Sequence, residues 1–214
     1  LLIQNFNHLK ESKMNREKLL QHLGILIFLT QISYSQVGIG TTTPTAQLEI
    51  DASATPTMPP FKIVPSVMPP TGTSSGQIAI IDNSLYIYDA TRSKWLSSEV
   101  SVFSWGNNGA TDNEYLEYAT TNASNSGAKI PVNATIVAVT IQTATSSTDN
   151  ARQFTIRKNN PSVDVVHFTT ATFTYNSILV NTDVNAGDFL QVFVNNEFNE
   201  VNSPIVTLWL KWRK

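Results

Sequence analysis

The chain has 214 residues, a formal net charge of −2 and no cysteine, and only 14% of its residues are charged. Its basic residues form no run longer than two, so it lacks the positively charged cluster that marks nucleic-acid-binding proteins. Without cysteine there are no disulfides, and stability must come from a buried core or from association between copies.

Residues 1–35 are interpreted as upstream residues followed by a signal peptide. Residues 14–18 form a short charged start, and residues 19–30 (LLQHLGILIFLT) form a compact apolar run. Ser33-Tyr34-Ser35 places small residues where a signal peptidase reads them, with Gln36 as the expected mature N-terminus. Because a membrane-spanning helix needs roughly 20 apolar residues, a cleaved signal is favoured over an uncleaved anchor or a buried helix.

The expected mature chain is therefore an exported protein without a stable membrane span, extracellular or on the cell surface of a bacterium. The leader holds four of the 14 basic residues and two of the 16 acidic residues, so its removal leaves a net charge of −4.

Residues 36–55 begin with VGIGTTTP and continue to a short alternating strand, QLEI. This segment has Val37, Ile39, Leu48 and Ile50 to bury but too few partners within itself, which predicts burial against other copies of the chain. The alternative is a flexible tail next to the signal.

Residues 56–76 and 77–100 are predicted as a connector and a β-hairpin. Six of the ten prolines lie between Pro56 and Pro70, a density that permits only an extended chain with short edge pairings. In the hairpin, apolar residues alternate on both sides of Asp82-Asn83-Ser84, residues that favour a tight turn. After the hairpin, the chain is expected to turn and present the indole of Trp95.

Residues 101–214 are predicted as a β-sandwich or jelly-roll head. Residues 105–109 (WGNNG) are read as a loop at its boundary, and some six to eight short strands separated by turn residues follow. The expected strands are 134–142, 152–158, 163–169, 172–181, 188–195 and 205–213. In the first of them Val137, Val139 and Ile141 are expected to share a face.

Two of these strands are apolar on both faces. Phe189 and Phe193 oppose the apolar set of their strand, and Ile205 and Trp209 oppose that of the last strand. A strand of this kind is covered on both sides, so these four residues, with Val37, Ile39, Leu48 and Ile50, are the candidate oligomer interface. The alternatives are cover by a loop of the same chain or an exposed binding platform.

Two segments resemble known proteins. Val37 to Ile50 (VGIGTTTPTAQLEI) resembles a segment of phage tail-fibre proteins and of exported bacterial surface proteins of fibre type, and residues 76–96 are similar to the segment that commonly follows it. Residues 130–136, 157–159, 186–188 and the last strand resemble trimeric jelly rolls of the complement and tumour-necrosis-factor type. The resemblance implies an all-β homotrimer with a short stalk and a jelly-roll head. It carries over no self-cleaving chaperone domain, because the matching serine–lysine signature is missing.

Residues for catalysis are sparse. His167 is the one histidine after residue 35, so the usual zinc and histidine-based nucleophile sites are excluded, and no cofactor or metal is expected. A partly buried structural role is expected for this imidazole. Acidic residues such as Asp112 and Glu114 are read as solvated loop acids.

Aromatic residues near the start of the head are the candidate ligand-binding residues. Trp105, Tyr115 and Tyr118 lie in a polar stretch, where aromatic rings beside amides suit stacking on sugar rings. The alternative is packing in the core or an interface.

The sequence thus predicts an exported, non-enzymatic surface or fibre protein. It would form a homotrimer and bind a partner, with a carbohydrate or another cell-surface ligand as the candidate. The alternatives are a purely structural surface or matrix subunit and, more remotely, a small glycan-active hydrolase.

Overall fold

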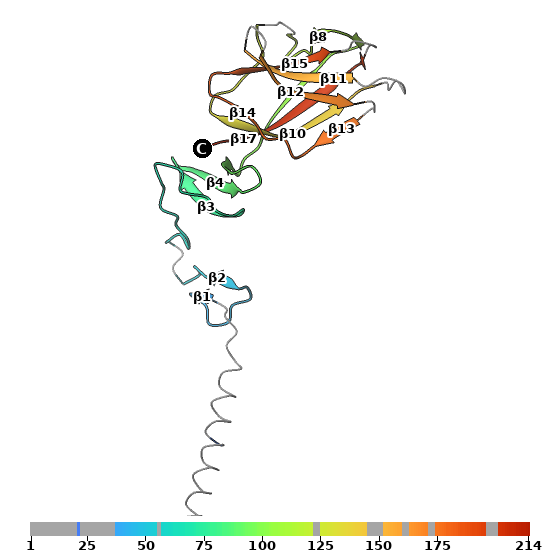
Figure 1. Cartoon of the computed structure of the whole chain (residues 1–214). Helices are drawn as coiled ribbons and strands as arrows, with labels where there is room; N and C mark the ends of the chain where they lie inside the picture. Colours follow the sequence, from blue (N-terminus) through green and yellow to red (C-terminus); the bar gives the residue numbers. More distant parts are fainter. Residues whose placement is uncertain are drawn as a thin grey trace, which may run out of the picture. The chain divides into compact units, whose positions relative to one another are not determined.

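The computed structural model describes residues 21, 37–54, 57–121, 125–144, 152–159, 163–170, 174–195 and 201–214, and every element assigned within them is a β-strand (Figure 1). The chain divides into two compact units, Leu1–Lys62 and Ile63–Lys214. Apart from Gln21, the predicted leader lies outside the described residues, and its export role stays a prediction. Within the described part of the chain, no helix has the length and apolar character needed to cross a membrane.

The first unit contains a small parallel strand pair. Strand β1 (Val37–Ile39) pairs with β2 (Leu48–Ile50), so that Val37 faces Leu48 and Ile39 faces Ile50. The chain turns at Gly40, whose φ is +81° and where a Cβ would lie 2.2 Å from the carbonyl oxygen of Asp51. Only glycine fits this turn.

The second unit opens with residues 63–76, which run along the edge of a small sheet. Ser66 forms a parallel bridge with Ile81, and its N–H donates to the Ile80 carbonyl oxygen at 2.8 Å. This is the short edge pairing that the proline density predicts. The boundaries proposed at residues 56–76 and 77–100 stay predictions.

The small sheet consists of β3 (Ile78–Ile81), β4 (Ser84–Asp89) and β5 (Lys94–Ser97) in antiparallel order. Asp82 and Asn83 connect β3 to β4 with φ values of 47° and 70°. Positive φ at both central residues is the geometry that a two-residue hairpin prefers, so the predicted hairpin is confirmed. The expectation for Trp95 is wrong: its side chain is 5% exposed and its indole N–H donates to the Pro70 carbonyl oxygen at 2.7 Å.

The head consists of two facing antiparallel sheets and is a β-sandwich (Figure 1). The first sheet has the order β13-β10-β17-β6, with β14 also paired to β10. Its strands are Thr174–Ser177, Ala134–Gln142, Ile205–Trp212, Ser101–Gly106 and Thr182–Val184, respectively.

The second sheet has the order β12-β11-β15-β8, with β9 also paired to β15. Its strands are Val163–Thr170, Arg152–Lys158, Phe189–Asn195, Glu114–Tyr115 and Ala128–Lys129, respectively. Strands β7 (Ala110–Thr111) and β16 (Val201–Asn202) form a separate pair.

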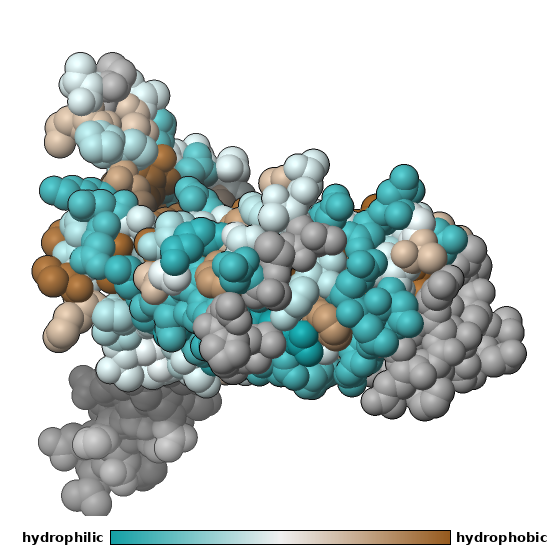
Figure 2. Space-filling view, turned by 90° about the horizontal axis from the view of Figure 1, so that it is seen from above, coloured by the Kyte–Doolittle hydropathy of each residue, from teal (hydrophilic) through white to brown (hydrophobic). Residues whose placement is uncertain are grey.

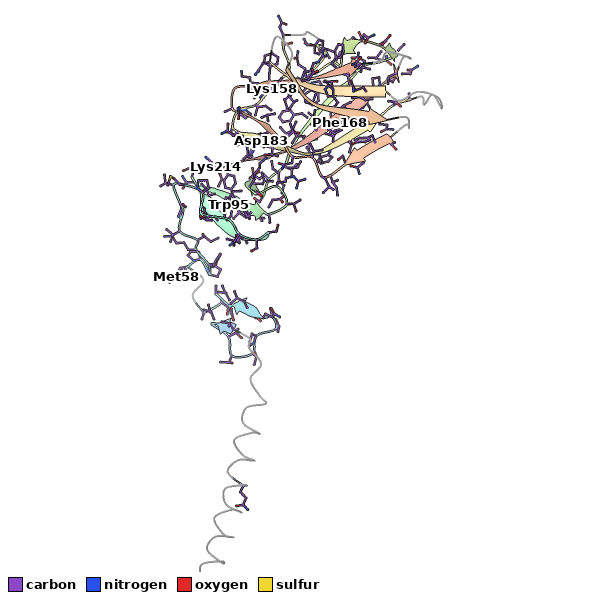
Figure 3. The ribbon with its side chains drawn as sticks, viewed as in Figure 1. Met58, Trp95, Lys158, Phe168, Asp183 and Lys214 are labelled. Atoms are coloured by element: carbon purple, nitrogen blue, oxygen red, sulfur yellow. The ribbon has the colours of Figure 1, made fainter. Side chains whose placement is uncertain are left out.

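Alternate side chains of the central strands point inward and form one core between the two sheets. In β17, Val206, Leu208 and Leu210 are fully buried, and in β11 Phe154 and Ile156 are fully buried. Phe168 of β12 also lies inside this core (Figure 3). Burying several large aliphatic and aromatic side chains at roughly 1.5–3 kcal/mol each is what holds the sandwich together.

A bulge in β10 changes the face of one residue. The register against β17 shifts between Ile136 and Ala138. As a result Ile136, Val139 and Ile141 are buried, whereas Val137 is only half-buried. The predicted inward position of Val137 is wrong, because an extra residue in a bulge reverses the alternation.

The predicted loop at Trp105-Gly106 is also wrong at those two residues. They end strand β6, in which Trp105 pairs with Val206 and Gly106 with Ile205. The irregular segment begins only at Asn107.

Polar contacts attach the small sheet to the head. The Arg92 guanidinium donates to the carbonyl oxygens of Val137, Ile178 and Val180 at 3.1, 2.7 and 2.8 Å. Lys94 Nζ lies 2.7 Å from Asp183 Oδ1. Five donors in a fixed planar fork suit arginine for joining several carbonyl groups at once.

The carboxyl group of Asp183 lies at the centre of this contact. Burial raises the pKa of Asp183, but hydrogen bonds from Lys94 and from Thr135 Oγ1 (2.7 Å), together with the charge of Arg213, lower it below its usual value. The small sheet and the head are therefore joined by an ionised carboxylate at neutral pH.

Candidate functional site

Trp105 and Tyr118, two of the three predicted ligand-binding residues, contribute to aromatic packing at the core. The Trp105 side chain is 2% exposed, and Tyr118 packs half-buried against the core. Their ring centroids lie 5.4 Å apart, and both contact Phe103 at 6.4 Å. A side chain as buried as Trp105 is not available to a ligand in this conformation, so the packing alternative describes it better.

Tyr115, the third predicted residue, lies on the outer face of the second sheet. It pairs across β8 and β15 with Phe193, and the two rings meet edge to face at 5.1 Å. The Arg157 guanidinium lies 3.8 Å from the Phe193 ring centroid and 5.6 Å from that of Tyr115. It also donates to the Tyr115 hydroxyl at 3.3 Å. A candidate ligand residue and a candidate interface residue thus share one cluster.

Three further polar side chains complete this cluster. Arg157 Nε donates to Asp164 Oδ1 at 2.8 Å, and Asp164 Oδ2 lies 3.8 Å from His167 Nε2. His167 Nδ1 is 2.9 Å from the Thr155 hydroxyl oxygen. We call Tyr115, Thr155, Arg157, Asp164, His167 and Phe193 the outer-face cluster.

The strand register explains why these residues meet. With Phe154 and Ile156 turned into the core, Thr155 and Arg157 of β11 point outward. In the sheet Thr155 is paired with both His167 and Phe193, and Arg157 with Asp164.

The order threonine, histidine, aspartate is that of a nucleophile, base and orienting acid. In this cluster the Thr155 side chain is 1% exposed, and the 3.8 Å between His167 and Asp164 exceeds a hydrogen bond. Asp164 is bound instead by Arg157. This arrangement is better suited to presenting a cation, an imidazole and a carboxylate for binding than to activating a hydroxyl.

His167 is more exposed than expected: 47% of its side chain is accessible, with 43% for Asp164. The sequence predicted no role for Arg157, Thr155 or Asp164. The sequence signal that could have identified these residues is the alternation of polar side chains along β11 and β12.

The candidate interface residues of the head lie on opposite outer faces. Phe189 and Phe193 are half-buried on β15 of the second sheet, whereas Ile205 and Trp209 on β17 of the first sheet are 51% and 38% exposed. They do not form one surface.

Trp209 lies at the centre of an apolar patch on the first sheet. It is flanked across the strands by Val102, which is 48% exposed, and by Ala138. Beside them the Ser104 and Thr207 hydroxyl groups hydrogen-bond each other at 2.8 Å. We call Val102, Ser104, Ala138, Ile205, Thr207 and Trp209 the Trp209 face.

The other four candidate interface residues lie together in the first unit. Val37, Ile39 and Leu48 are 52%, 55% and 59% exposed, and Ile50 is half-buried. The strand pair brings them side by side without covering them. The space-filling view likewise shows a mostly hydrophilic surface with apolar side chains gathered in a few places (Figure 2).

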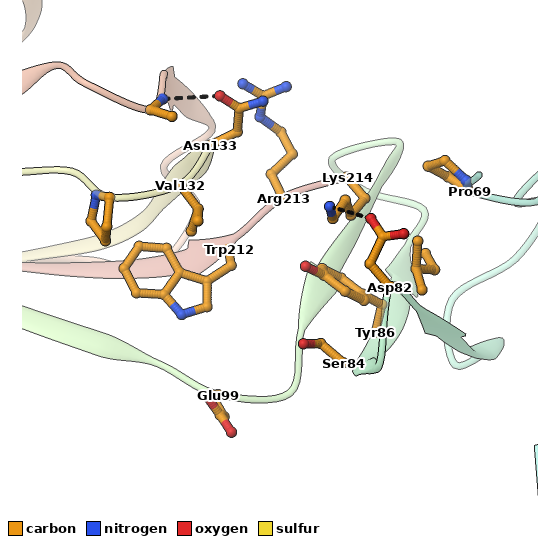
Figure 4. Close-up of a pocket in the computed structure, with 13 residues that line it drawn as sticks. Pro69, Asp82, Ser84, Tyr86, Glu99, Val132, Asn133, Trp212, Arg213 and Lys214 are labelled. Atoms are coloured by element: carbon orange, nitrogen blue, oxygen red, sulfur yellow. Dashed lines mark hydrogen bonds and ion pairs between the residues drawn. The ribbon is translucent and has the colours of Figure 1, made fainter. Parts of the chain in front are cut away.

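A cleft of about 780 Å³ lies in the second unit, between the small sheet and the head (Figure 4). Trp212 and Glu99 lie on one side and Ser84 and Tyr86 on the other. Lys214 Nζ and Asp82 Oδ2 form an ion pair of 2.7 Å in it. Its volume lies within the roughly 300–1,000 Å³ typical of small-molecule sites.

The described residues hold no group of three or more histidine, cysteine, aspartate or glutamate side chains placed to bind a metal ion. The sequence matches no family model, no curated protein matches it, and no solved structure matches the fold.

Proposed function

We propose that this chain is an exported, non-enzymatic surface or fibre protein of a bacterium, whose β-sandwich head associates with copies of itself and recognises a partner in adhesion. The glycine-containing segment, by its resemblance to fibre proteins, supports the fibre role and the homotrimer. The leader sequence supports export.

The topology of the head supports the jelly-roll class. Strands that follow one another in the chain repeatedly change sheets: β10 lies in the first, β11 and β12 in the second, β13 and β14 in the first, β15 in the second and β17 in the first. Two four-stranded paths, β13-β10-β17-β6 and β12-β11-β15-β8, face each other. Crossing between sheets in this way is the mark of a double Greek key.

The Trp209 face carries the proposal that the head self-associates. Its central strand, β17, already buries Val206, Leu208 and Leu210 in the core, yet Ile205 and Trp209 remain exposed on the other side. Leaving an indole between Val102 and Ala138 in water loses the free energy that a covering surface would supply. Three copies of the chain that place this apolar, uncharged patch at a common threefold axis would cover it on one another.

The outer-face cluster supports partner recognition. It combines two aromatic rings with a guanidinium, a carboxylate and an imidazole on a rigid sheet, the residue types that contribute most to binding surfaces. A purely structural subunit is the second candidate. It is favoured by the pairing of the charges within the cluster, since Arg157 is already bound to Asp164 and Tyr115.

Native mass, measured by light scattering at micromolar and nanomolar concentrations, tests the proposal. We expect a trimer for the wild type at micromolar concentration. Trp209→Glu places a charge in the proposed contact and should weaken association by at least about 30-fold, the effect of a hot spot worth about 2 kcal/mol.

Leu179→Glu is the matched control, because Leu179 is an apolar residue with 76% exposure outside the Trp209 face. It should leave the mass unchanged. A monomeric wild type, or a Trp209→Glu variant with unchanged mass, would overturn the proposal for this face.

A further inference from the structure

The cleft between the small sheet and the head has two walls fixed by main-chain contacts. The Lys214 N–H donates to the Trp95 carbonyl oxygen at 3.1 Å, and the Trp212 N–H donates to Ser97 Oγ at 3.0 Å. On the head side the Arg213 N–H donates to the Asn133 carbonyl oxygen at 2.8 Å. A ligand would enter a preformed site, which lowers the entropic cost of binding.

Several polar side-chain groups in this cleft have no hydrogen-bond partner among the described residues. They are the indole N–H of Trp212, the hydroxyl groups of Ser84 and Tyr86 and the carboxylate of Glu99. Burial raises the pKa of Tyr86 above its usual value, so its hydroxyl is protonated at neutral pH and able to donate. Trp212, Ser84 and Tyr86 offer donors around one space, and the exposed Glu99 carboxylate offers an acceptor at its edge (Figure 4).

By contrast, the backbone N–H and C=O groups that line the cleft are largely hydrogen-bonded within the protein. Ile81 is bonded within β3 and β4 and bridged by Ser66, and the N–H groups of residues 212–214 are all donated. An extended peptide that adds to a sheet needs free main-chain donors and acceptors. The available recognition groups here belong to side chains.

The side-chain charges that line the cleft sum to zero. The lining has Asp82 and Glu99 against Arg213 and Lys214; Asp82 and Lys214 pair directly, and Arg213 Nε lies 3.5 Å from Asp183 Oδ1 outside the lining. The apolar part of the lining includes Trp212, Pro131 and Val132 of the head, together with Pro69, Ile81 and Ala186. A matching ligand is therefore uncharged, with one apolar surface and several hydroxyl groups.

We propose that this cleft binds a neutral saccharide, with the indole of Trp212 against the C–H face of a sugar ring and Glu99, Ser84 and Tyr86 hydrogen-bonded to its hydroxyl groups. A pyranose ring has the required amphipathic form. The inference deepens the recognition function proposed above and rests on it, but it uses different residues from the outer-face cluster and the Trp209 face.

Titration of the full chain with four neutral trisaccharides, namely cellotriose, maltotriose, mannotriose and chitotriose, tests the inference, with trigalacturonate as the acidic comparison. We expect at least one neutral trisaccharide to bind below about 10 mM, measured by calorimetry, and to change tryptophan fluorescence. Trp212→Phe should abolish the fluorescence change, because the other three tryptophans lie outside the cleft.

Glu99→Gln should weaken binding about tenfold, the effect of losing a hydrogen bond to a charged group, and Ser84→Ala should weaken it less. Both residues are exposed, so these variants test the site even if Trp212→Phe does not fold. Glu117→Gln, at an exposed carboxylate outside the cleft, is the control and should bind as the wild type does.

The inference is overturned if none of the four trisaccharides binds at about 10 mM, if Glu99→Gln and Ser84→Ala bind unchanged, or if trigalacturonate binds more tightly than the neutral sugars. Native mass measured on the same samples separates this result from the oligomer proposal. A trimer that binds no sugar removes the saccharide site alone.

Discussion

The outer faces of the two sheets differ in how their large apolar side chains are covered. Strands β15 and β17 both carry large apolar side chains on the side away from the core. On β15, Phe193 is covered by Arg157 and Tyr115 of the same chain. On β17, Trp209 and Ile205 stay exposed among the described residues.

The difference shows that an apolar pattern on both faces of a strand does not by itself identify an interface. A long side chain with an apolar stem and a planar cation, such as arginine, is able to cover an aromatic ring within one chain. Around Trp209 the cross-strand neighbours Val102 and Ala138 are short, and the tryptophan stays 38% exposed.

Substitutions of two neighbouring residues of β17, one on the inner face and one on the outer face, should differ most in their effect on the free energy of unfolding. Leu208→Ala removes a fully buried side chain and should lower the free energy of unfolding by about 2–5 kcal/mol at any protein concentration. Trp209→Ala should cost about 1 kcal/mol or less in dilute solution, with a larger loss appearing only where copies associate.

Urea unfolding of both variants at nanomolar and micromolar concentrations measures the contrast. A Trp209→Ala variant whose stability loss is the same at both concentrations would show that the indole is stabilised within one chain.

Arg157→Ala should destabilise the other outer face by about 1–2 kcal/mol, because the variant loses the cover of Phe193 and the pairing with Asp164. Arg157→Lys keeps the charge but not the planar group and should recover only part of the loss. Chemical denaturation gives both values. Full stability of Arg157→Ala would mean that other groups cover Phe193.

The smallest effect is expected where the small sheet is attached through Asp183. Because the pKa of Asp183 is lowered in the folded state, its contribution is fully present above the ordinary value of about 4 and is lost as the pH falls through the folded pKa. Asp183→Asn should cost about 1 kcal/mol or less at pH 7, since the carboxylate is 39% exposed.

The same variant should lose less stability than the wild type between pH 7 and pH 3, measured by urea unfolding. Asp112→Asn, at an exposed position, is the control. Equal acid sensitivity of Asp183→Asn and the wild type would show that other carboxyl groups, such as Asp89 and Asp188, account for the pH dependence, since their pKa values are lowered too.

The positions of strands in the head can be predicted from the sequence, because the alternation of apolar and polar residues and the positions of the turn residues indicate the same boundaries. The predicted strands 134–142 and 152–158 have the observed bounds, and the turn before β15 has Gly187 at a φ of +91°. The bulge at Val137 is different. No residue type in β10 predicts the bulge. The face of the sheet on which each later residue of β10 lies depends on it.

The candidate sites depend on features that a sequence does not contain. Tyr115 was identifiable as an aromatic residue in a polar stretch, but the outer-face position of the half-buried Tyr115 and the burial of Trp105 follow from the sheet to which each belongs. Arg157 and Asp164 meet only because of the strand register, which has its own shift between Ile156 and Arg157. The cleft requires the contact between the small sheet and the head.

Strand β17 also sets the order in which the molecule can form. Its neighbours in the sheet are β6 and β10, from residues 101–106 and 134–142, and Lys214 and Arg213 bond to the small sheet and to Asn133. Neither the sandwich nor the cleft can close before residues 205–214 have been synthesised. Pairings this distant along the chain fold slowly, and a chain exported as we propose would stay unfolded during that delay.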